Sequence, residues 1–234
     1  MNFFERLTNY FWINLDLLFR KCYLKAEVQK LAAGRFGDSV GDLEDIRKHV
    51  SLLLSNVDMT LHYPQELAPN VIPVGGLHVH RAGQLPQDLQ SLLDNAKKGV
   101  ILFSLGTNVR SDRLNPEIRD AIIKALSRLE QIVIWKFETN LTEVPSNVII
   151  RQWVPQTEIL AHRNTRLFIS HGGGLSTMEA AYYGVPVLGI PFFVDQFINL
   201  IMMENKGIAR QISYPTISED IVYTNIREML DNPK

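Results

Sequence analysis

The chain has 234 residues, 46% of them hydrophobic, and its 24 basic and 25 acidic side chains leave a formal net charge of −1. This apolar content supports a sizeable core and excludes an intrinsically disordered chain, and the charge balance argues against nucleic acid as the main partner. The single cysteine, Cys22, excludes an internal disulfide and a zinc site built from cysteines.

The first part of the chain is expected to be mixed helix and strand. Residues 1–33 carry apolar side chains at helical spacing and predict a helix that packs into a core, in preference to one that lies on a membrane. A short helix is expected after Asp42, a buried strand over 50–56 and a short strand over 71–76.

Residues 78–90 are rich in Gly, Pro and Gln and are interpreted as a linker. We therefore expect one domain over 1–83, including the linker, and a second over 84–234.

In the second part, strands and helices alternate. Strands are expected from Val100 to the Gly106 turn and over 132–136, 148–150, 167–170, 185–190 and 208–212. Helices are expected over 116–130, 155–162, up to about 183, over 195–206 and from 218. The strands are apolar throughout, which is typical of a parallel sheet covered by helices on both faces. The sequence therefore predicts an α/β, doubly wound, Rossmann-like domain over 84–234.

Neither a secretory signal nor a membrane span is expected. Glu5 and Arg6 stand where a signal would need an apolar run, and the longest apolar stretch, 185–194, is about half a bilayer span and contains two prolines. As written, the chain is expected to be soluble or cytoplasmic, or at most peripheral.

The strongest motif runs from Ser170 through His171, three glycines, Leu175 and Ser176 to Thr177, between an expected strand and an expected helix. Glycines let the backbone approach a ligand closely, and the free amides that open a helix favour an anion. Ser170, His171 and Ser176 add hydrogen-bond donors for phosphate oxygens. An ordinary glycine turn is the alternative, and the G-x-G-x-x-G dinucleotide fingerprint is absent.

Residues that suit a nucleotide follow other strands. Ser104 and Thr107 flank the turn after the first strand and suit either a phosphate or a helix cap. Trp153 offers a flat face to a base and Gln156 offers an amide to its edge, although a tryptophan beside a proline turn is more often part of a core. On the helix after the glycine turn, Glu179 suits a ribose diol.

After the fifth strand, Asp195 and Gln196 suit the hydroxyls of a sugar, and Asp195 equally suits a helix cap. Because the carboxyl ends of parallel strands meet at one edge, all these residues are expected to converge on one crevice. The convergence favours a nucleotide with a second polar group attached. His78 and His80 have no convincing third ligand nearby, so we expect no metal and no cofactor.

Together these residues resemble the UDP-glycosyltransferase family, which includes glucuronosyltransferases and the insect and plant glycosyltransferases. The resemblance is densest over 153–162 and 168–196, and Leu175-Ser176 is similar to the insect branch. Shorter similar stretches are Phe103–Gly106, Ile134–Phe137 and Asn70–Leu77.

The resemblance implies a GT-B-type fold, here one complete Rossmann-like donor domain plus the remnant of an N-terminal acceptor domain. It implies a UDP-sugar as co-substrate, with Trp153 stacked on uracil. The other residues that the family pattern assigns to the UDP-sugar are Ser104, Thr107, Lys136, Gln156, Ser170, His171, Gly173, Ser176, Glu179, Asp195 and Gln196. Lys136 stands at a position that is often arginine in relatives.

The resemblance also implies inverting transfer of a hexosyl group from UDP-glucose or UDP-glucuronate to a small lipophilic hydroxyl acceptor. Relatives use a histidine and an aspartate of the first domain as general base, and no histidine here stands in that context, so the base is expected upstream of Met1. The carboxy-terminal part is expected to be truncated. The alternative is a catalytically incomplete UDP-sugar-binding module that forms homo- or hetero-oligomers with full-length relatives. Family members are anchored in the endoplasmic reticulum membrane and act in detoxification.

Overall fold

The computed structural model describes residues 2–63, 66–141 and 143–231. Contacts divide the chain into an N-terminal unit, Met1–Leu53, and a larger unit, Leu54–Lys234.

The N-terminal unit is helical. Its elements are α1 (Phe3–Phe19), a π-helical turn η1 (Arg20–Leu24), α2 (Lys25–Phe36), a short turn η2 (Asp38–Val40) and α3 (Leu43–Lys48). Asn2 and Glu5 form a capping box at the start of α1, and Asp42 caps α3, which is the short helix expected after that residue.

The apolar face of α1 is exposed, which contradicts the expectation of a core-packing helix. Leu7 is 53% exposed and Phe11 is 58% exposed, and no residue of α1 is buried. The amphipathic pattern does produce a helix, but the described residues of this unit supply no second layer to cover it. None of the helices in the described ranges is both long enough and apolar enough to cross a bilayer.

The strand expected to be buried over 50–56 is shorter and exposed. Strand β1 (Leu53–Ser55) pairs with β2 (Val71–Pro73) in a two-stranded sheet, and Leu53 and Leu54 are both more than half exposed. The expectation of burial is wrong because, as far as the chain is described, this small sheet has no apolar layer over either face.

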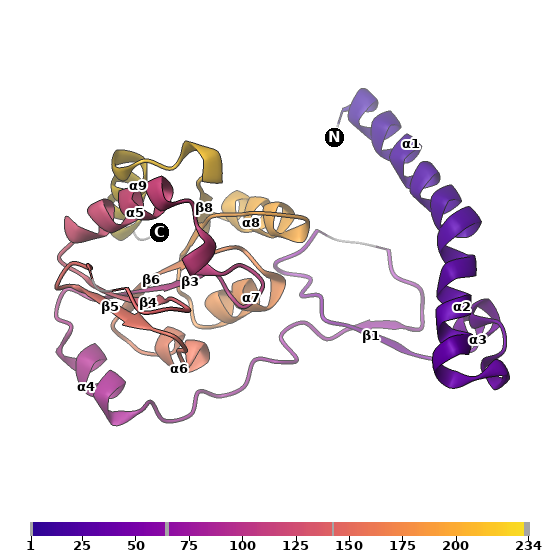
Figure 1. Ribbon diagram of the computed structural model, residues 1–234, viewed down its shortest axis with the longest axis horizontal. Coiled ribbons are helices and arrows are strands. Elements are labelled where there is room, and N and C mark those ends of the chain that lie inside the picture. The colour runs from indigo at the N-terminus through magenta and orange to yellow at the C-terminus, as the bar shows by residue number, and fades with distance from the viewer. Residues whose placement is uncertain (1, 64–65, 142, 232–234) are drawn as a thin grey trace. The chain divides into compact units, whose positions relative to one another are not determined.

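A six-stranded sheet forms the centre of the described part of the larger unit (Figure 1). In sequence it contains β3 (Val100–Ser104), β4 (Ile132–Lys136), β5 (Val148–Arg151), β6 (Thr165–Ser170), β7 (Val187–Gly189) and β8 (Ala209–Gln211). The spatial order is β5-β4-β3-β6-β7-β8, and every neighbouring pair is parallel. The expected doubly wound sheet is confirmed.

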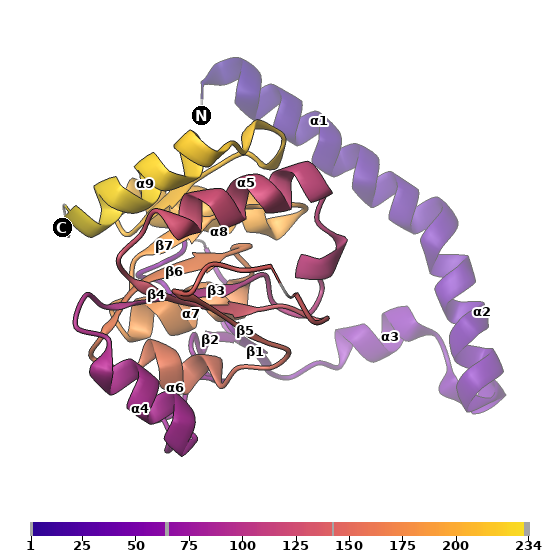
Figure 2. The ribbon, with the colours of Figure 1, turned by 60° about the vertical axis from the view of Figure 1, so that its left-hand side comes forward.

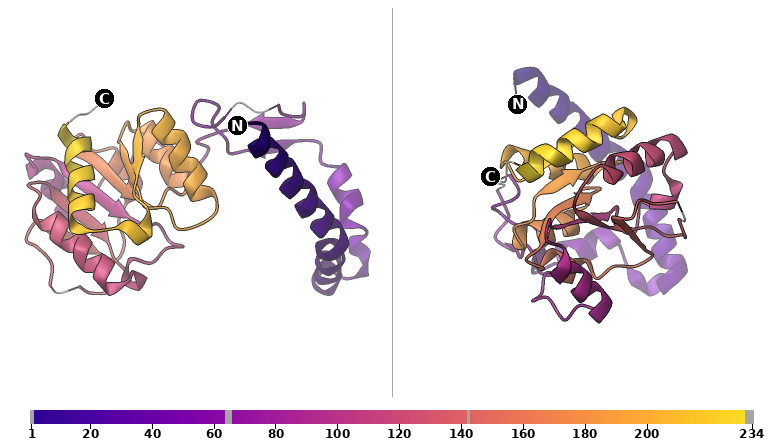
Figure 3. Two further views of the ribbon diagram at one scale, coloured as in Figure 1. Left: turned by 90° about the horizontal axis from the view of Figure 1, so that it is seen from above. Right: turned by 90° about the vertical axis from the view of Figure 1, so that its left-hand side faces the viewer.

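Helices cover both faces of this sheet. One face carries α5 (Pro116–Ser127) and α9 (Glu219–Asp231), which lie side by side in Figure 2. The other face carries α4 (Gln87–Asn95), α6 (Gln156–Leu160), α7 (Gly174–Tyr182) and α8 (Asp195–Asn205). Figure 3 shows strands between α5 and α9 on one side and α4 on the other.

The alternation along β3 explains its continuous apolar sequence. Ile101 and Phe103 pack toward α5 and α9, whereas Val100 and Leu102 pack toward the opposite helices. Both sets of side chains are fully buried, which explains why every residue of the strand before Ser104 is apolar.

The linker expected over 78–90 contains the start of α4, so that part of the interpretation is wrong. The missed signal is the spacing of Leu89, Leu92 and Leu93, of which Leu89 and Leu93 are buried against the sheet.

The contact division falls at Leu53, earlier than the expected boundary at 83/84. The reason is that residues 54–83 bond to the sheet domain: Tyr183 Oη donates to the His80 carbonyl at 2.9 Å, and His78 Nε2 lies 3.1 Å from the Leu175 carbonyl oxygen.

Replacing the buried Ile134 of β4 with alanine should destabilise the larger unit by about 2–5 kcal/mol, because it leaves a cavity between the sheet and its helices. The matched variant Ile198→Ala, at a side chain that is 56% exposed, should change the free energy of unfolding by less than about 0.5 kcal/mol. Urea denaturation followed by tryptophan fluorescence measures both. Equal losses would contradict the packing described here.

Candidate functional site

Three neighbouring strands end at the same level. Ser104 of β3 pairs in register with Ser170 of β6, and Ser170 pairs with Gly189 of β7. The chain continues from β3 toward β4 and from β6 toward β7, so the connections leave in opposite directions between β3 and β6. In open parallel sheets this switch point is where ligands bind.

His171 occupies the centre of this edge. Its ring lies so close to Gly106 and Gly173 that a Cβ on either would collide with it, at 2.7 Å from Cε1 and 2.5 Å from Nε2 respectively. The loops after β3 and β6 therefore meet at this ring. Gly106 also has a φ of +78°, a conformation that glycine adopts without strain.

The His171 ring is buried, and its burial favours the neutral form of the imidazole. Burial lowers the pKa of His171 below its ordinary value, and the nearby carboxylate of Asp195 offsets part of that effect by raising the pKa. Among the described residues, Nδ1 is buried and has no hydrogen-bond partner. Buried polar atoms usually have a hydrogen-bond partner. An unpaired one at the edge of the sheet where ligands bind is typical of a group that contacts a ligand.

Helix α7 starts directly beside that ring. Gly173 is its N-cap and carries no side chain that could occupy the first amides. The positive end of the helix dipole thus opens at the same edge. Ser104 Oγ accepts from Gly106 N at 3.3 Å and Ser170 Oγ accepts from Gly172 N at 3.2 Å, so both predicted serines are buried and hold the turns.

A second cluster connects the start of α6, which follows the loop after β5, with α7. The Glu179 carboxylate accepts from Gln156 Nε2 at 2.5 Å and from Thr157 Oγ1 at 3.1 Å, and Gln156 Nε2 also lies 3.2 Å from Ser176 Oγ. Gln156, Ser176 and Glu179 are thereby brought together as expected. Thr157 was not expected, and its position directly after Gln156 was the available signal.

Trp153 lies in the loop between β5 and α6, and it is 72% exposed. The alternative in which this tryptophan belongs to the core is wrong, because the turn at Val154 and Pro155 buries the valine and leaves the indole outside. An exposed indole face is available for stacking.

The start of α8, which follows the loop after β7, is tied to the glycine turn. Asn199 Nδ2 donates both to the Gly172 carbonyl and to Asp195 Oδ2, each at 3.0 Å. Gln196 is 3% exposed, and its Oε1 accepts from Phe192 N at 2.8 Å and Phe193 N at 3.2 Å. Asn199 was missed by sequence reasoning, although its place one turn after Asp195 predicts a shared helix face.

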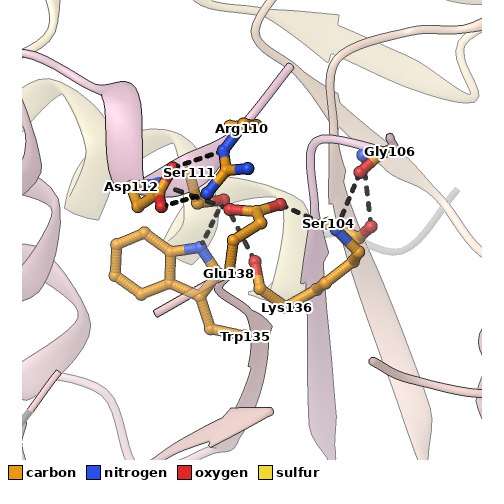
Figure 4. A network of polar contacts seen from close by, with 8 residues as sticks. All are labelled: Ser104, Gly106, Arg110, Ser111, Asp112, Trp135, Lys136 and Glu138. Carbon is orange, nitrogen blue, oxygen red and sulfur yellow. Dashed lines mark hydrogen bonds and ion pairs between the residues drawn. The ribbon is translucent and has the colours of Figure 1, made fainter. Parts of the chain in front are cut away.

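Lys136 and Thr107 lie on the β3 side of the edge. Thr107 is exposed next to Gly106. Lys136 is buried, and its Nζ donates to the Gly106 carbonyl at 3.0 Å and to Glu138 Oε1 at 2.7 Å (Figure 4). Two of its three donors are thus used within the protein.

No group of three or more histidine, cysteine, aspartate or glutamate side chains in the described ranges is arranged to hold a metal ion. His78 instead lies near Asn56 and the Leu175 carbonyl, and the His80 carbonyl accepts from Tyr183.

Comparison with known proteins gives a consistent picture. The family model described as UDP-glucoronosyl and UDP-glucosyl transferase matches residues 1–234. UDP-glucosyltransferase 2 of Dactylopius coccus is 36% identical over 99% of this chain and 45% of its own length. The 2-hydroxyacylsphingosine 1-beta-galactosyltransferase of Rattus norvegicus is 37% identical over 78% of this chain and 34% of its own length.

Among solved structures, the glycotransferase of kitacinnamycin aligns with a TM-score of 0.64 at 22% identity, over 78% of this chain and 47% of that one. This likeness supports the GT-B-type fold. The chain spans less than half the length of these relatives. The match of the family model across the full sequence, together with the convergent loops, shows that the chain belongs to the UDP-glycosyltransferase family.

Proposed function

We propose that the edge formed by the loops after β3, β5, β6 and β7 binds a UDP-sugar, and that the whole protein transfers its hexosyl group to a small lipophilic hydroxyl compound with inversion. The carrying observation is the buried His171 ring between Gly106 and Gly173, beside the open N-terminus of α7. UDP-glucose is the favoured donor, since the Dactylopius coccus relative is named a glucosyltransferase, and UDP-glucuronate is the other candidate.

The diphosphate would lie against the start of α7. The first amides of that helix and the His171 ring offer donors to phosphate oxygens without bringing a fixed positive charge. When the bond between the sugar C1 and the diphosphate oxygen breaks, negative charge grows on the departing UDP. Donors that are already oriented toward that charge favour the transition state.

The uridine would extend toward β5. The exposed Trp153 indole offers a stacking face, and the Glu179 carboxylate, held by Gln156 and Thr157, offers acceptors for the ribose hydroxyls. On the opposite side, Asp195 and Gln196 would contact the sugar. For an acceptor, the name of the Rattus norvegicus relative supports a lipophilic hydroxyl compound. We also propose that the whole protein is located at the endoplasmic reticulum membrane, as the family resemblance implies.

Gly173→Ala should weaken UDP binding by about tenfold or more, because its Cβ would lie 2.5 Å from His171 Nε2 and would displace the ring. Gly174→Ala is the matched control, since its Cβ would make ordinary contact at 3.7 Å with Asn199 Nδ2 and should leave UDP affinity within about twofold. Isothermal titration calorimetry measures both. If Gly173→Ala bound UDP with unchanged affinity, His171 would not be part of the UDP-binding site.

Glu179→Ala should abolish the preference for UDP over 2′-deoxy-UDP. If the carboxylate accepts from the 2′-hydroxyl, the unchanged protein should prefer UDP by about tenfold, which is the worth of one hydrogen bond to a charged group. The variant should bind both ligands equally. Glu204→Ala, on the exposed side of α8, should keep the preference. A preference that survives Glu179→Ala would place the ribose elsewhere.

The lowered pKa of His171 makes stability depend on pH. When the pH falls below 6.5, the ordinary pKa of histidine, His171 takes up a proton in the unfolded chain but not yet in the folded chain. The free energy of unfolding therefore decreases as the pH falls from 6.5 toward the lowered pKa of the folded state. Above pH 6.5 this histidine does not change the stability. Between pH 7 and 5, His171→Asn should therefore lose stability less steeply than the unchanged protein, by at most about 1.4 kcal/mol per pH unit. Parallel slopes in urea denaturation would contradict a buried neutral histidine.

A further inference from the structure

A network of polar contacts joins the end of β4 to the loop between β3 and α5. Lys136 Nζ donates to the carbonyl of Gly106, near the start of that loop, and to Glu138 Oε1. The other carboxylate oxygen, Glu138 Oε2, accepts from Asp112 N at 3.3 Å, further along the loop. Figure 4 shows the lysine side chain extended toward the Gly106 turn.

A third attachment lies between these two. Ser111 Oγ donates to the Lys136 carbonyl at 3.0 Å and accepts from Trp135 Nε1 at 3.2 Å, and Ser111 and Trp135 are both buried. The loop is therefore held to the last two residues of β4, and to Glu138 just beyond them, at Gly106, Ser111 and Asp112. Held in this way, the Gly106 turn has little freedom to move relative to the sheet.

The charges of the network balance. Lys136 pairs with Glu138 at 2.7 Å, with side chains that are 9% and 14% exposed, and Arg110 forms a two-pronged pair with Asp112 at 2.9 and 2.5 Å. Two cations and two anions give the cluster no net formal charge to attract a diphosphate. A buried ion pair of this kind contributes little net stability, whereas removing one partner leaves an uncompensated buried charge.

We propose that Lys136 and Glu138 are positioning residues for the nucleotide diphosphate: they brace the β3–α5 loop so that Gly106 holds the His171 ring in place. A Cβ at Gly106 would lie only 2.7 Å from His171 Cε1, so the backbone of this turn lies close to the ring and a shift of the turn alters the space that the ring occupies. This inference rests on the UDP-binding function proposed above. It differs from the role that the family resemblance implies for Lys136, which is direct contact with the UDP-sugar.

The two roles predict opposite effects of Glu138→Gln. If Lys136 itself held the phosphate, removing the competing carboxylate would free the ammonium and leave UDP affinity equal or tighter. If the pair is a brace, the substitution loosens Gly106 and should weaken UDP binding by about tenfold, the loss expected for one charge-assisted hydrogen bond. Affinity for uridine, which lacks the diphosphate, should stay within about twofold.

Four further variants complete the test, each measured by calorimetry with UDP and with uridine. Lys136→Met should weaken UDP binding as Glu138→Gln does, and Lys136→Arg should rescue it because arginine retains donors for both partners. Ser111→Ala loosens the same loop without changing any charge, so it tests the brace if Glu138→Gln does not fold. Glu130→Gln removes a carboxylate from an exposed pair with Lys98 and should change nothing.

The outcomes separate the two proposals. If the unchanged protein binds no UDP, the proposed function fails. If it binds UDP but Glu138→Gln and Ser111→Ala retain or improve UDP affinity, the brace is overturned and Lys136 is left as a phosphate contact. Equal losses for UDP and uridine would indicate general loosening of the fold and would also overturn it. A selective loss for UDP, with rescue by Lys136→Arg, supports it.

Discussion

The contact of one imidazole ring with two glycines is the constraint on which the rest of the site depends. Gly106 comes from the loop after β3 and Gly173 from the N-cap of α7, and a side chain on either would displace His171. The two loops can meet there because Ser104 and Ser170 end neighbouring parallel strands at the same register position. The sheet thus determines where the ring lies, and the glycines determine how closely the backbone surrounds it.

The His171 ring is a donor that adds no charge of its own. Burial lowers its pKa, with Asp195 acting in the opposite direction, and it leaves Nδ1 without a partner among the residues that the structure describes. The charge that favours an anion comes instead from the α7 N-terminus. In the proposed site, the donor and the charge that favours a diphosphate thus come from different elements.

The sequence predicted those features of the structure that depend on local residue patterns. The strands of the large sheet were predictable because burial on both faces makes each one apolar throughout, as in β3. Convergence of Gln156, Ser176 and Glu179 followed from the topology of parallel strands. The exposure of α1 was not predictable, because an amphipathic pattern indicates that one helix face suits burial but does not identify the element that would pack against it. The contact of Lys136 with Glu138 was not predicted because residue type suggested a phosphate, although Glu138 two residues later lies on the same side of an extended chain.

At the proposed sugar end of the site the backbone is strained, whereas at the proposed phosphate end glycines relieve strain. Val194 has a φ of +49° and a ψ of −117°, a conformation that costs a β-branched residue about 1–3 kcal/mol. The surrounding bonds hold it there, since Gln196 Oε1 accepts from Phe192 N and Phe193 N and Asn199 ties Asp195 back to Gly172. The buried Gln196 amide is therefore first a clamp on this turn. Because the strained residue comes directly before Asp195, the turn sets where that carboxylate stands, so the residues expected to contact the sugar also hold the backbone that presents them.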